Sequence, residues 1–300
     1  MSAPPLTAIV LAAGLGKRMK SALPKALIPV AGKPMVIKVI EALKAASVER
    51  IVVVIGHKGK DVESAILNAG FNDVIFSLQK LQLGTGDAAK EGLKKIPGDA
   101  DNILILPADV PLISADYISD LFQNHTKSCA DVTLLTTTLM DPAGYGRIIR
   151  DRNGNLTSIK EDKDCTEAEK AIKEVNVGIY CFKYAFLREA LKNLSTDNAQ
   201  KEYYITDTIH AAFEKGLKVE AINIPNPSKL LGANTRFELF ALERIVMEER
   251  IKEIMENGGS VPFPQTVLIE EGVTVGDRVS IGGNVQLLGE TVIEDDVTIE

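Results

Sequence analysis

The sequence predicts an α/β domain with a doubly wound parallel sheet, followed by a linker helix and a short region of hexapeptide repeats. Three observations support this. Unbroken apolar runs alternate with amphipathic stretches up to about residue 230, a long helical pattern follows, and apolar residues then recur every six positions. The chain has 300 residues, enough for about two domains. We expect a first domain over residues 1–233, a linker helix over 234–258 and a repeat region over 259–300.

The strands of the first domain are predicted from three apolar runs, each followed by a residue that favours a turn. They are 7–13 before Gly14, 51–55 before Gly56 and 103–106 before Pro107. Amphipathic stretches at 35–46, 61–69 and 85–95 separate them. Strands that are apolar throughout are typical of a parallel sheet with helices on both faces. The first domain is therefore predicted to be doubly wound.

A long helical segment over 234–257 is interpreted as a connector. Its larger apolar residues recur at mixed three- and four-residue spacing: Phe237, Phe240, Ile245, Ile251 and Met255. Charged residues lie between them, and Gly258 and Gly259 end the pattern, as expected at a helix C-terminus.

The last 34 residues contain a six-residue repeat. Positions 267, 273, 279, 285, 291 and 297 carry Val or Thr, and the positions two further on carry Ile, Val or Leu. This pattern is typical of a left-handed parallel β-helix in which three hexapeptides form one coil, so nearly two coils are expected. Because repeat arrays usually need about three units and a cap, we expect either a truncated chain or a stub that packs on another element or subunit.

Charge and cysteine content exclude several classes of protein. Lys and Arg number 34 against 41 Asp and Glu, a net charge of −7, whereas a nucleic-acid or membrane-surface binder needs a basic footprint. Cys129, Cys165 and Cys181 show no CxxC spacing, so we expect three reduced thiols in a cytoplasmic protein. Residues 1–7 lack the positive region of a signal peptide, and the apolar stretch 8–13 is too short to span a bilayer.

The first predicted strand leads into a glycine-containing segment, Leu11-Ala12-Ala13-Gly14-Leu15-Gly16-Lys17-Arg18-Met19. Small residues at the carboxyl end of a strand let the backbone approach a ligand, and successive N–H groups there can bind phosphate. The segment matches neither GxGxxG nor a P-loop, and by itself it equally fits a tight strand-to-helix turn. Arg18 and Lys25 close by favour a polyphosphate site over two solvated surface cations.

Asp109 follows the third predicted strand and precedes Val110 and Pro111. A carboxylate at this edge of the sheet suits Mg²⁺, which binds proteins through one or two carboxylates and the phosphates of a substrate. An Asx turn is the alternative interpretation, and Asp109 alone favours it. The histidines His57, His125 and His210 have no identifiable acid–base partner in the sequence.

Taken together, these segments resemble the sugar-nucleotide pyrophosphorylases, and among them the bacterial bifunctional N-acetylglucosamine-1-phosphate uridyltransferases. The resemblance extends in order from about Thr7 to Arg236 and continues into the linker helix and repeats. Besides the segments above, it rests on Pro24-Lys25, Gln79, Gln82-Leu83-Gly84-Thr85-Gly86, Gly144-Tyr145-Gly146-Arg147-Ile148, Glu161-Asp162-Lys163-Asp164, Glu174-Val175-Asn176-Val177-Gly178, 198–207 and 232–236.

The resemblance implies a Rossmann-like nucleotidyltransferase that uses Mg²⁺, UTP and a sugar 1-phosphate. It implies that the nucleotide is bound by Leu11, Ala12, Ala13, Gly14, Gly16, Lys25, Gln79, Gly84 and Thr85. Arg18 and Lys25 would be the catalytic residues, and Asp109 and Asn234 the metal ligands. The sugar would be bound by Asp109, Gly146, Glu161, Asn176 and Tyr204. Without the resemblance, Gln79 and Asn176 would be ordinary polar loop residues, Gly146 a turn residue and Glu161 part of a solvated charge run.

The implied reaction is attack of the sugar phosphate on the α-phosphorus of UTP, with pyrophosphate leaving in line and no protein nucleophile. The sequence departs from the family at Pro107-Ala108, where relatives have Tyr-Gly, and at Asp87, where they have His. Sugar specificity is therefore open, with glucose 1-phosphate as the main alternative and a silent sugar-nucleotide-binding module as another. Acetyltransferase residues of the relatives lie beyond residue 300, so no acetyl transfer is expected. The relatives form homotrimers through the β-helix.

Overall fold

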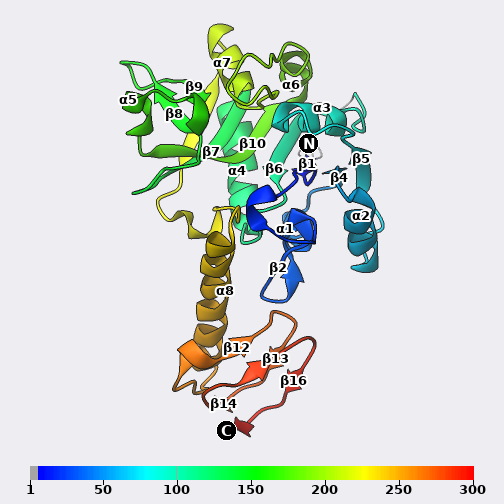
Figure 1. Ribbon diagram of the computed structural model, residues 1–300, viewed down its shortest axis with the longest axis vertical. Coiled ribbons are helices and arrows are strands. Elements are labelled where there is room, and N and C mark those ends of the chain that lie inside the picture. Colours follow the sequence, from blue (N-terminus) through cyan, green and yellow to red (C-terminus); the bar gives the residue numbers. More distant parts are fainter. Residues whose placement is uncertain (1–5, 99) are drawn as a thin grey trace.

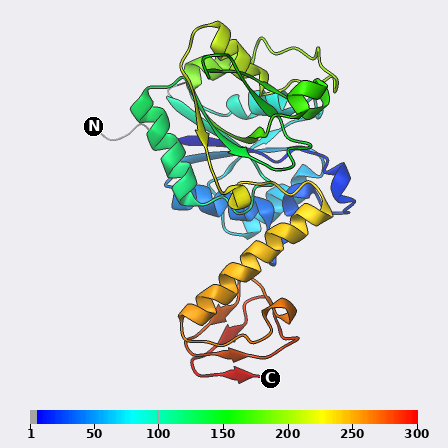
Figure 2. The same ribbon diagram turned by 90° about the vertical axis from the view of Figure 1, so that its left-hand side faces the viewer.

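The computed structural model describes residues 6–98 and 100–300. The expectation about residues 1–7 therefore falls mostly outside the described residues. An α/β region occupies one end of an elongated molecule and the C-terminal repeats occupy the other, with one long helix between them (Figures 1 and 2).

A nine-stranded mixed sheet forms the centre of the α/β region, in the order β11-β7-β10-β6-β1-β4-β5, with β8 and β9 branching from β10. Its strands are β1 (Thr7–Leu11), β4 (Arg50–Ile55), β5 (Ile75–Leu78), β6 (Asn102–Pro107), β7 (Val132–Thr138), β8 (Arg147–Arg150), β9 (Leu156–Lys160), β10 (Glu174–Lys183) and β11 (Val219–Asn223). Strands β6, β1, β4 and β5 are mutually parallel. The three predicted strands are confirmed to within two residues at each end.

Helices cover both faces of this sheet, which confirms the doubly wound prediction. They are α1 (Met35–Ala45), α2 (Gly59–Asn68), α3 (Thr85–Leu93), α4 (Ala115–Ser128), α6 (Tyr184–Ala190) and α7 (Asp207–Glu214), whereas the single turn α5 (Glu167–Lys170) lies beside β8 and has no buried residue. Along β1, Ala8 and Val10 pack into a core cluster with α1, α2 and α4, whereas Ile9 packs into the opposite cluster with α3, α6 and α7. Apolar side chains are therefore needed at successive positions.

The sheet is not parallel throughout, because β10 runs antiparallel to both β6 and β7. The chain enters β10 after the antiparallel β8–β9 pair and the single turn of α5, without the crossover helix that a parallel strand requires. The register of β10 shifts between Asn176 and Tyr180, where Gly178 has a φ of 80°. This irregularity bends β10 beside the end of β6.

Helix α8 (Arg236–Glu256) is the predicted connector, and Thr235 and Glu238 form a capping box at its start. Its first half packs on the α/β region through Leu239, Leu242 and Val246, and its second half packs on the repeats through Ile251 and Ile254. Of the larger apolar residues noted in this segment, Ile251 is buried, whereas Phe237 is 78% exposed and Phe240 and Met255 are also exposed. A helix with different partners at its two ends needs no continuous apolar stripe.

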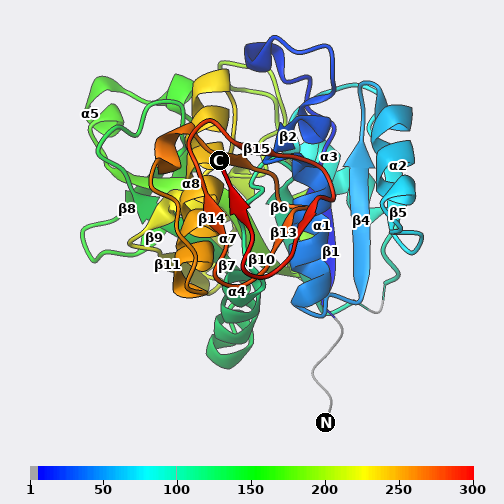
Figure 3. The same ribbon diagram turned by 90° about the horizontal axis from the view of Figure 1, so that it is seen from below.

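The repeats form three parallel two-stranded sheets. Their strands are β12 (Leu268–Ile269), β13 (Thr274–Val275), β14 (Ser280–Ile281), β15 (Gln286–Leu287), β16 (Val292–Ile293) and β17 (Thr298–Ile299). Each strand pairs with the one 18 residues later, such as Leu268 with Gln286. The view from below shows these strands grouped under α8 (Figure 3).

A short hairpin of the α/β region also contacts the repeats. It consists of β2 (Pro29–Val30) and β3 (Lys33–Pro34), and the carbonyl of Ala31 at its tip accepts a hydrogen bond from the N–H of Glu271 at 3.0 Å. The carboxylate of Glu271 forms an ion pair with Lys38 on α1. The repeats therefore contact the α/β region through this hairpin and α1, in addition to their connection through α8.

Membrane and thiol features can be stated for the described part of the chain. No helix within it is both long and apolar enough to cross a bilayer. Cys129, Cys165 and Cys181 are free thiols, and the last two are buried.

His125 on α4 is a core residue with hydrogen-bond partners at both ring nitrogens. Its Nδ1 lies 2.8 Å from Thr133 Oγ1 and its Nε2 lies 3.0 Å from Asn102 Oδ1. The side chain is 1% exposed. Burial and, to a smaller extent, the positive charge of Lys183 lower the pKa of His125 to about 4, although the charge of Asp131 opposes them. The folded protein therefore holds a neutral imidazole at pH 7.

We expect the free energy of unfolding to fall as the pH drops from about 6.5 towards 4, because the unfolded chain then takes up a proton that folded His125 does not. The contribution is at most about 3 kcal/mol. Denaturant unfolding at pH 7 and pH 4.5 should show that His125→Gln loses this part of the pH dependence, whereas His210→Gln, at an exposed position, keeps it. An unchanged pH dependence in His125→Gln would contradict the assignment.

Candidate functional site

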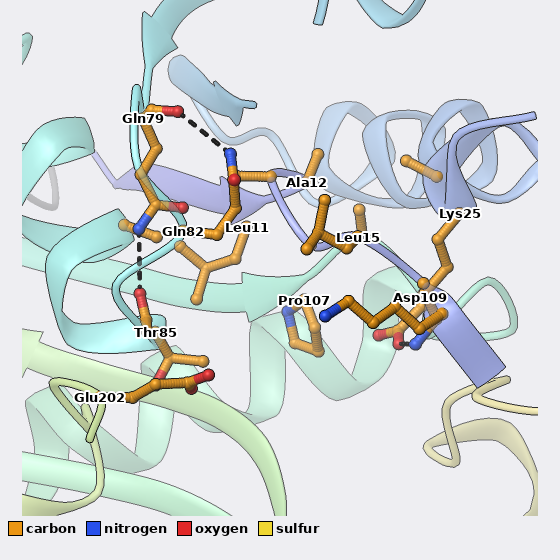
Figure 4. Close-up of a pocket in the computed structure, with 18 of the residues that line it drawn as sticks. Leu11, Ala12, Leu15, Lys25, Gln79, Gln82, Thr85, Pro107, Asp109 and Glu202 are labelled. Atoms are coloured by element: carbon orange, nitrogen blue, oxygen red, sulfur yellow. Dashed lines mark hydrogen bonds and ion pairs between the residues drawn. The ribbon is translucent and has the colours of Figure 1, made fainter. Parts of the chain in front are cut away.

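A cavity of about 620 Å³ lies at the carboxyl ends of the parallel strands β1 and β6. This is the edge of an open α/β sheet at which ligands bind. Ten of the predicted site residues line the cavity: Leu11, Ala12, Ala13, Gly14, Gly16, Lys25, Gln79, Gly84, Thr85 and Asp109. Lys17, Gln82, Lys163, Gln200 and Glu202 also line it. Figure 4 shows Gln79, Gln82 and Thr85 at one end of the cavity, with Lys25 and Asp109 at the other.

The glycine-containing segment forms the turn that leaves β1 and enters the short 3₁₀ helix η1 (Lys17–Met19). Gly16 has a φ of 58°, and a Cβ at this position would lie 2.7 Å from the Cβ of Lys25. Glycine is therefore required at position 16 for two reasons: the backbone adopts a left-handed conformation, and Lys25 approaches too closely for a side chain. A Cβ at Gly14, by contrast, would meet no protein atom within 4 Å.

Four predicted residues meet at one end of the cavity, where Lys25 and Asp109 line it and Arg18 and Asn234 bond to this group without being lining residues. The ammonium of Lys25, at the start of η2 (Lys25–Leu27), forms an ion pair with Asp109 and donates a hydrogen bond to Asn234 Oδ1 at 2.7 Å. Arg18 Nη2 donates to the same Asn234 oxygen at 3.0 Å. The backbone brings these groups together, since the N–H of Ala233 donates to the carbonyl of Asp109 at 3.0 Å.

Tyr145 lies close enough to the same end of the cavity to respond to its charges. Burial, together with the carboxylates of Glu238 and Asp109, raises the pKa of Tyr145 to about 12, while the charge of Arg18 opposes them. Its hydroxyl therefore stays protonated at neutral pH and can donate a hydrogen bond.

The opposite end of the cavity is built around Gln79, which is 3% exposed and follows β5. Its backbone N–H donates to the carbonyl of Ile55 at 2.8 Å. Its amide Nε2 donates to the carbonyl of Gly84 at 3.1 Å and to Asp87 Oδ2 at 2.8 Å. Asp87 was noted in the sequence only as a departure from the family, and its contact with Gln79 could not be read there.

Gly84 and Thr85 are attached to the segment that contains Tyr203. The N–H of Tyr203 donates to the carbonyl of Leu83 at 2.7 Å, and the N–H of Gly86 donates to the carbonyl of Tyr203 at 2.8 Å. Gly84 has a φ of 112°, and a Cβ there would lie 2.5 Å from the Tyr203 carbonyl oxygen. The start of α3 is therefore fixed in place from both sides.

The predicted sugar-binding residues other than Asp109 form a separate group beside the cavity and are not among its lining residues. A Cβ at Gly146 would lie 3.7 Å from both Asn176 Cβ and Glu161 Oε2, so these three residues are neighbours. Glu161 accepts a hydrogen bond from Thr206 Oγ1 at 2.9 Å. Burial raises the pKa of Glu161, the Thr206 hydrogen bond opposes this rise, and the charge of Asp207 adds to it.

Asn176 and Tyr204 are the other two predicted sugar-binding residues of this group. The amide of Asn176 donates to the Tyr180 hydroxyl at 2.6 Å and accepts from the N–H of Gly178 at 3.0 Å, which leaves one hydrogen and one lone pair. Tyr204 is buried, and burial raises the pKa of its hydroxyl to about 12.

Arg147 is a buried residue to which the sequence analysis gave no role. It is 2% exposed on β8, where Nη2 donates to Asp162 Oδ1 at 3.0 Å and Nη1 donates to the carbonyl of Tyr145. Arg147 therefore connects the segment around Gly146 to the segment around Glu161. The sequence feature that could have indicated a role for Arg147 is its position as a charged residue at the start of an apolar strand.

The departure at Pro107-Ala108 places two small side chains beside the cavity. Ala108 is buried in the core cluster on the α1 face, and its N–H donates to the carbonyl of Leu11 at 3.0 Å. A Cβ at Gly178 would lie 3.7 Å from Pro107 Cγ, so Pro107 lies against the bend in β10.

Within the described residues, no group of three or more His, Cys, Asp or Glu side chains is arranged to hold a metal ion. The oxygens of Asp109 and Asn234 nevertheless converge on one cation, the ammonium of Lys25. This donor set fits Mg²⁺, which takes few protein ligands and completes its shell with substrate phosphates and water.

Comparisons with known proteins agree with this architecture. Residues 8–175 match the family described as MobA-like NTP transferase domain. The bifunctional protein GlmU of Carboxydothermus hydrogenoformans is 42% identical over 285 residues, covering 95% of this chain and 63% of that protein. The bifunctional protein GlmU of Desulfotalea psychrophila is 38% identical over 296 residues, covering 99% of this chain and 86% of that protein.

The chain spans 62–64% of the length of the first relatives that it matches. Among solved structures, a putative glucose-1-phosphate thymidylyltransferase from Bacillus anthracis in complex with a sucrose has a TM-score of 0.63 and is 19% identical. That similarity covers 80% of this chain and 94% of the other. At this identity it shows the shared fold.

The two glycines of the first turn should respond differently to alanine. We expect Gly16→Ala to lower the free energy of unfolding by about 1–3 kcal/mol, because alanine is strained at this φ and its Cβ displaces Lys25. Gly14→Ala is the matched control and should change the free energy by less than about 0.5 kcal/mol. Equal losses in the two variants, measured by urea denaturation, would contradict the geometry of the turn.

Proposed function

The chain belongs to the bifunctional GlmU family of MobA-like NTP transferases, and on that premise we propose that it makes UDP-N-acetylglucosamine and pyrophosphate from UTP and N-acetylglucosamine 1-phosphate. The observation that carries this proposal is the convergence of Arg18, Lys25, Asp109 and Asn234 at one end of a cavity. Two cationic side chains suit the phosphate oxygens of a polyphosphate, and two side-chain oxygens that can act as metal ligands suit a divalent metal bound with it.

In this proposal the nucleotide lies along the cavity. Backbone groups of residues 11–14 and 16 bind it, its base lies against Gln79, Gly84 and Thr85, and its triphosphate extends towards Lys25 and Arg18. Support comes from the separation of the two ends, because the buried amide of Gln79 lies opposite the charged cluster (Figure 4).

The proposed reaction needs no protein nucleophile, since the attacking phosphate oxygen is already anionic. It attacks the α-phosphorus, a new P–O bond forms, and the bond to the leaving pyrophosphate breaks. Lys25 and Arg18 hold the triphosphate and stabilise the charge that accumulates on the transferring group. Asp109 and Asn234 are the residues that would hold Mg²⁺, and the bound ion would neutralise charge on the phosphate oxygens.

We further propose that Gly146, Glu161, Asn176 and Tyr204 bind the sugar beside the cavity, together with Asp109. The neighbouring positions of Gly146, Glu161 and Asn176 support this assignment. A carboxylate that accepts hydrogen bonds and an amide that both donates and accepts them suit sugar hydroxyl and acetamido groups. Arg147 would keep the two segments that carry Gly146 and Glu161 in register.

The repeat region is proposed to be the start of a left-handed parallel β-helix. Its support is the 18-residue pairing interval, equal to three hexapeptides. The proposed division is a nucleotidyltransferase domain over 1–233, a linker helix over 234–258 and the repeats over 259–300. Assembly as a homotrimer through the repeats and a location in the cytoplasm are further parts of the proposal, taken from the resemblance and the free cysteines.

The proposal is tested by measuring pyrophosphate release from UTP with N-acetylglucosamine 1-phosphate or glucose 1-phosphate, each with and without Mg²⁺. We expect Mg²⁺-dependent release with the acetylated sugar, because the resemblance covers the predicted sugar-binding residues. Release only with glucose 1-phosphate would instead indicate that the sugar specificity has changed, and would assign that change to the altered Pro107-Ala108 segment. Nucleotide binding without any release would indicate a silent binding module.

Lys25→Ala should lower kcat by about 10²–10³-fold, the scale for losing one electrostatic stabiliser of a transition state. The exposed Lys95, outside the cavity lining, provides the control variant Lys95→Ala, which should retain wild-type kcat. Steady-state kinetics at saturating UTP and sugar phosphate make the comparison. A Lys25→Ala variant with wild-type kcat would remove Lys25 from the catalytic group.

A further inference from the structure

The side-chain amide of Gln79 is held in one orientation by two acceptors. Nε2 lies 2.8 Å from Asp87 Oδ2 and 3.1 Å from the carbonyl oxygen of Gly84. An ionised carboxylate and a backbone carbonyl accept hydrogen bonds and cannot donate them. The two hydrogens of Nε2 must therefore face these partners, because the reverse orientation would place Oε1 against two other oxygens.

This orientation determines what Gln79 offers to a ligand. With both hydrogens of Nε2 committed, the remaining polar atom is Oε1, which can only accept a hydrogen bond. Gln79 lines the cavity and is 3% exposed, so water has little access with which to compensate a mismatched partner. The residue therefore presents a hydrogen-bond acceptor to the cavity.

The backbone segments that carry Gln79 and its partner Asp87 are each held by hydrogen bonds to other elements. Asp87 lies in the first turn of α3, where the helix N-terminus favours a negative charge. The start of α3 is attached to Tyr203, and the backbone of Gln79 is hydrogen-bonded to Ile55 at the end of β4. Gln79 and Asp87 are thus held by different elements, and their contact is a consequence of the tertiary structure.

We propose that Asp87 is a positioning residue for base recognition, which turns the Gln79 oxygen towards the cavity and so selects a pyrimidine with a ring N–H. Uracil carries a hydrogen at N3 and can donate it to Oε1. Cytosine has an unprotonated N3 that only accepts, so the same oxygen would oppose it. This inference rests on the proposed function for the presence of the base at this end of the cavity.

The test compares the affinities of UTP and CTP by calorimetry for the wild type and for Asp87→Asn. Asparagine has the size of aspartate but can present either an oxygen or an N–H group, so only the Gly84 carbonyl still favours the original orientation of the Gln79 amide and the reversed orientation becomes accessible. We expect the preference for UTP over CTP to fall at least about tenfold. The ratio of kcat/KM values for the two nucleotides should fall in parallel, while the KM for the sugar phosphate stays unchanged.

Asp61→Asn is the matched control, because Asp61 occupies the same position in the first turn of α2 as Asp87 does in α3. It should leave nucleotide preference unchanged. In a Gln79→Ala background, Asp87→Asn should have no further effect on the preference, since the residue acts through Gln79. Asp87→Glu, which keeps a carboxylate, should restore part of the preference for UTP.

The inference would be overturned by an unchanged UTP-to-CTP ratio in Asp87→Asn, by the same loss in Asp61→Asn, or by an undiminished effect of Asp87→Asn without the Gln79 side chain. A wild-type protein that binds neither nucleotide would overturn it as well. Selective UTP binding that depends on Asp87, without pyrophosphate release, would overturn the proposed function and support this inference. Pyrophosphate release, together with an unchanged UTP-to-CTP ratio in Asp87→Asn, would support the proposed function and overturn this inference.

Discussion

Burial of the central strands on both faces is the constraint on which the rest of the structure depends. Residues of β1 alternate between two core clusters, so neither face of the strand is available for polar groups. The polar site residues that follow β1 and β6 therefore lie in the segments that leave these strands at their carboxyl ends. The turn after β1 and the segment after β6 leave the same edge, which brings Lys25 and Asp109 into contact.

The charged end of the cavity gives a local exception to the overall charge of the chain. The protein carries a net charge of −7, yet Arg18 and Lys25 point to one amide oxygen, that of Asn234. Asn234 immediately precedes the capping box of α8. The start of the helix that holds the repeats therefore contributes directly to the site, and the backbone hydrogen bond between Ala233 and Asp109 couples the two regions.

The other end of the cavity depends on contacts between segments that are distant in sequence. Leu83 and Gly86 are hydrogen-bonded to Tyr203, and the Thr85 hydroxyl accepts from the N–H of Ile205 at 3.1 Å. The same segment supplies Thr206, which donates to Glu161. One loop therefore contacts both the surroundings of Gln79 and those of the proposed sugar-binding group.

The sequence by itself determined the strands and helices that surround the first turn, the position of α8 and the repeat interval, because apolar periodicity reports local structure directly. It also identified the segments that carry Arg18, Lys25, Asp109 and Asn234. Only the tertiary structure decided that β10 runs antiparallel, which side of α8 is buried, that Gln79 donates a hydrogen bond to Asp87 and that Arg147 bonds to both Asp162 and the Tyr145 carbonyl. These features depend on contacts between residues far apart in the chain, and no local pattern records which distant partner a polar side chain will meet.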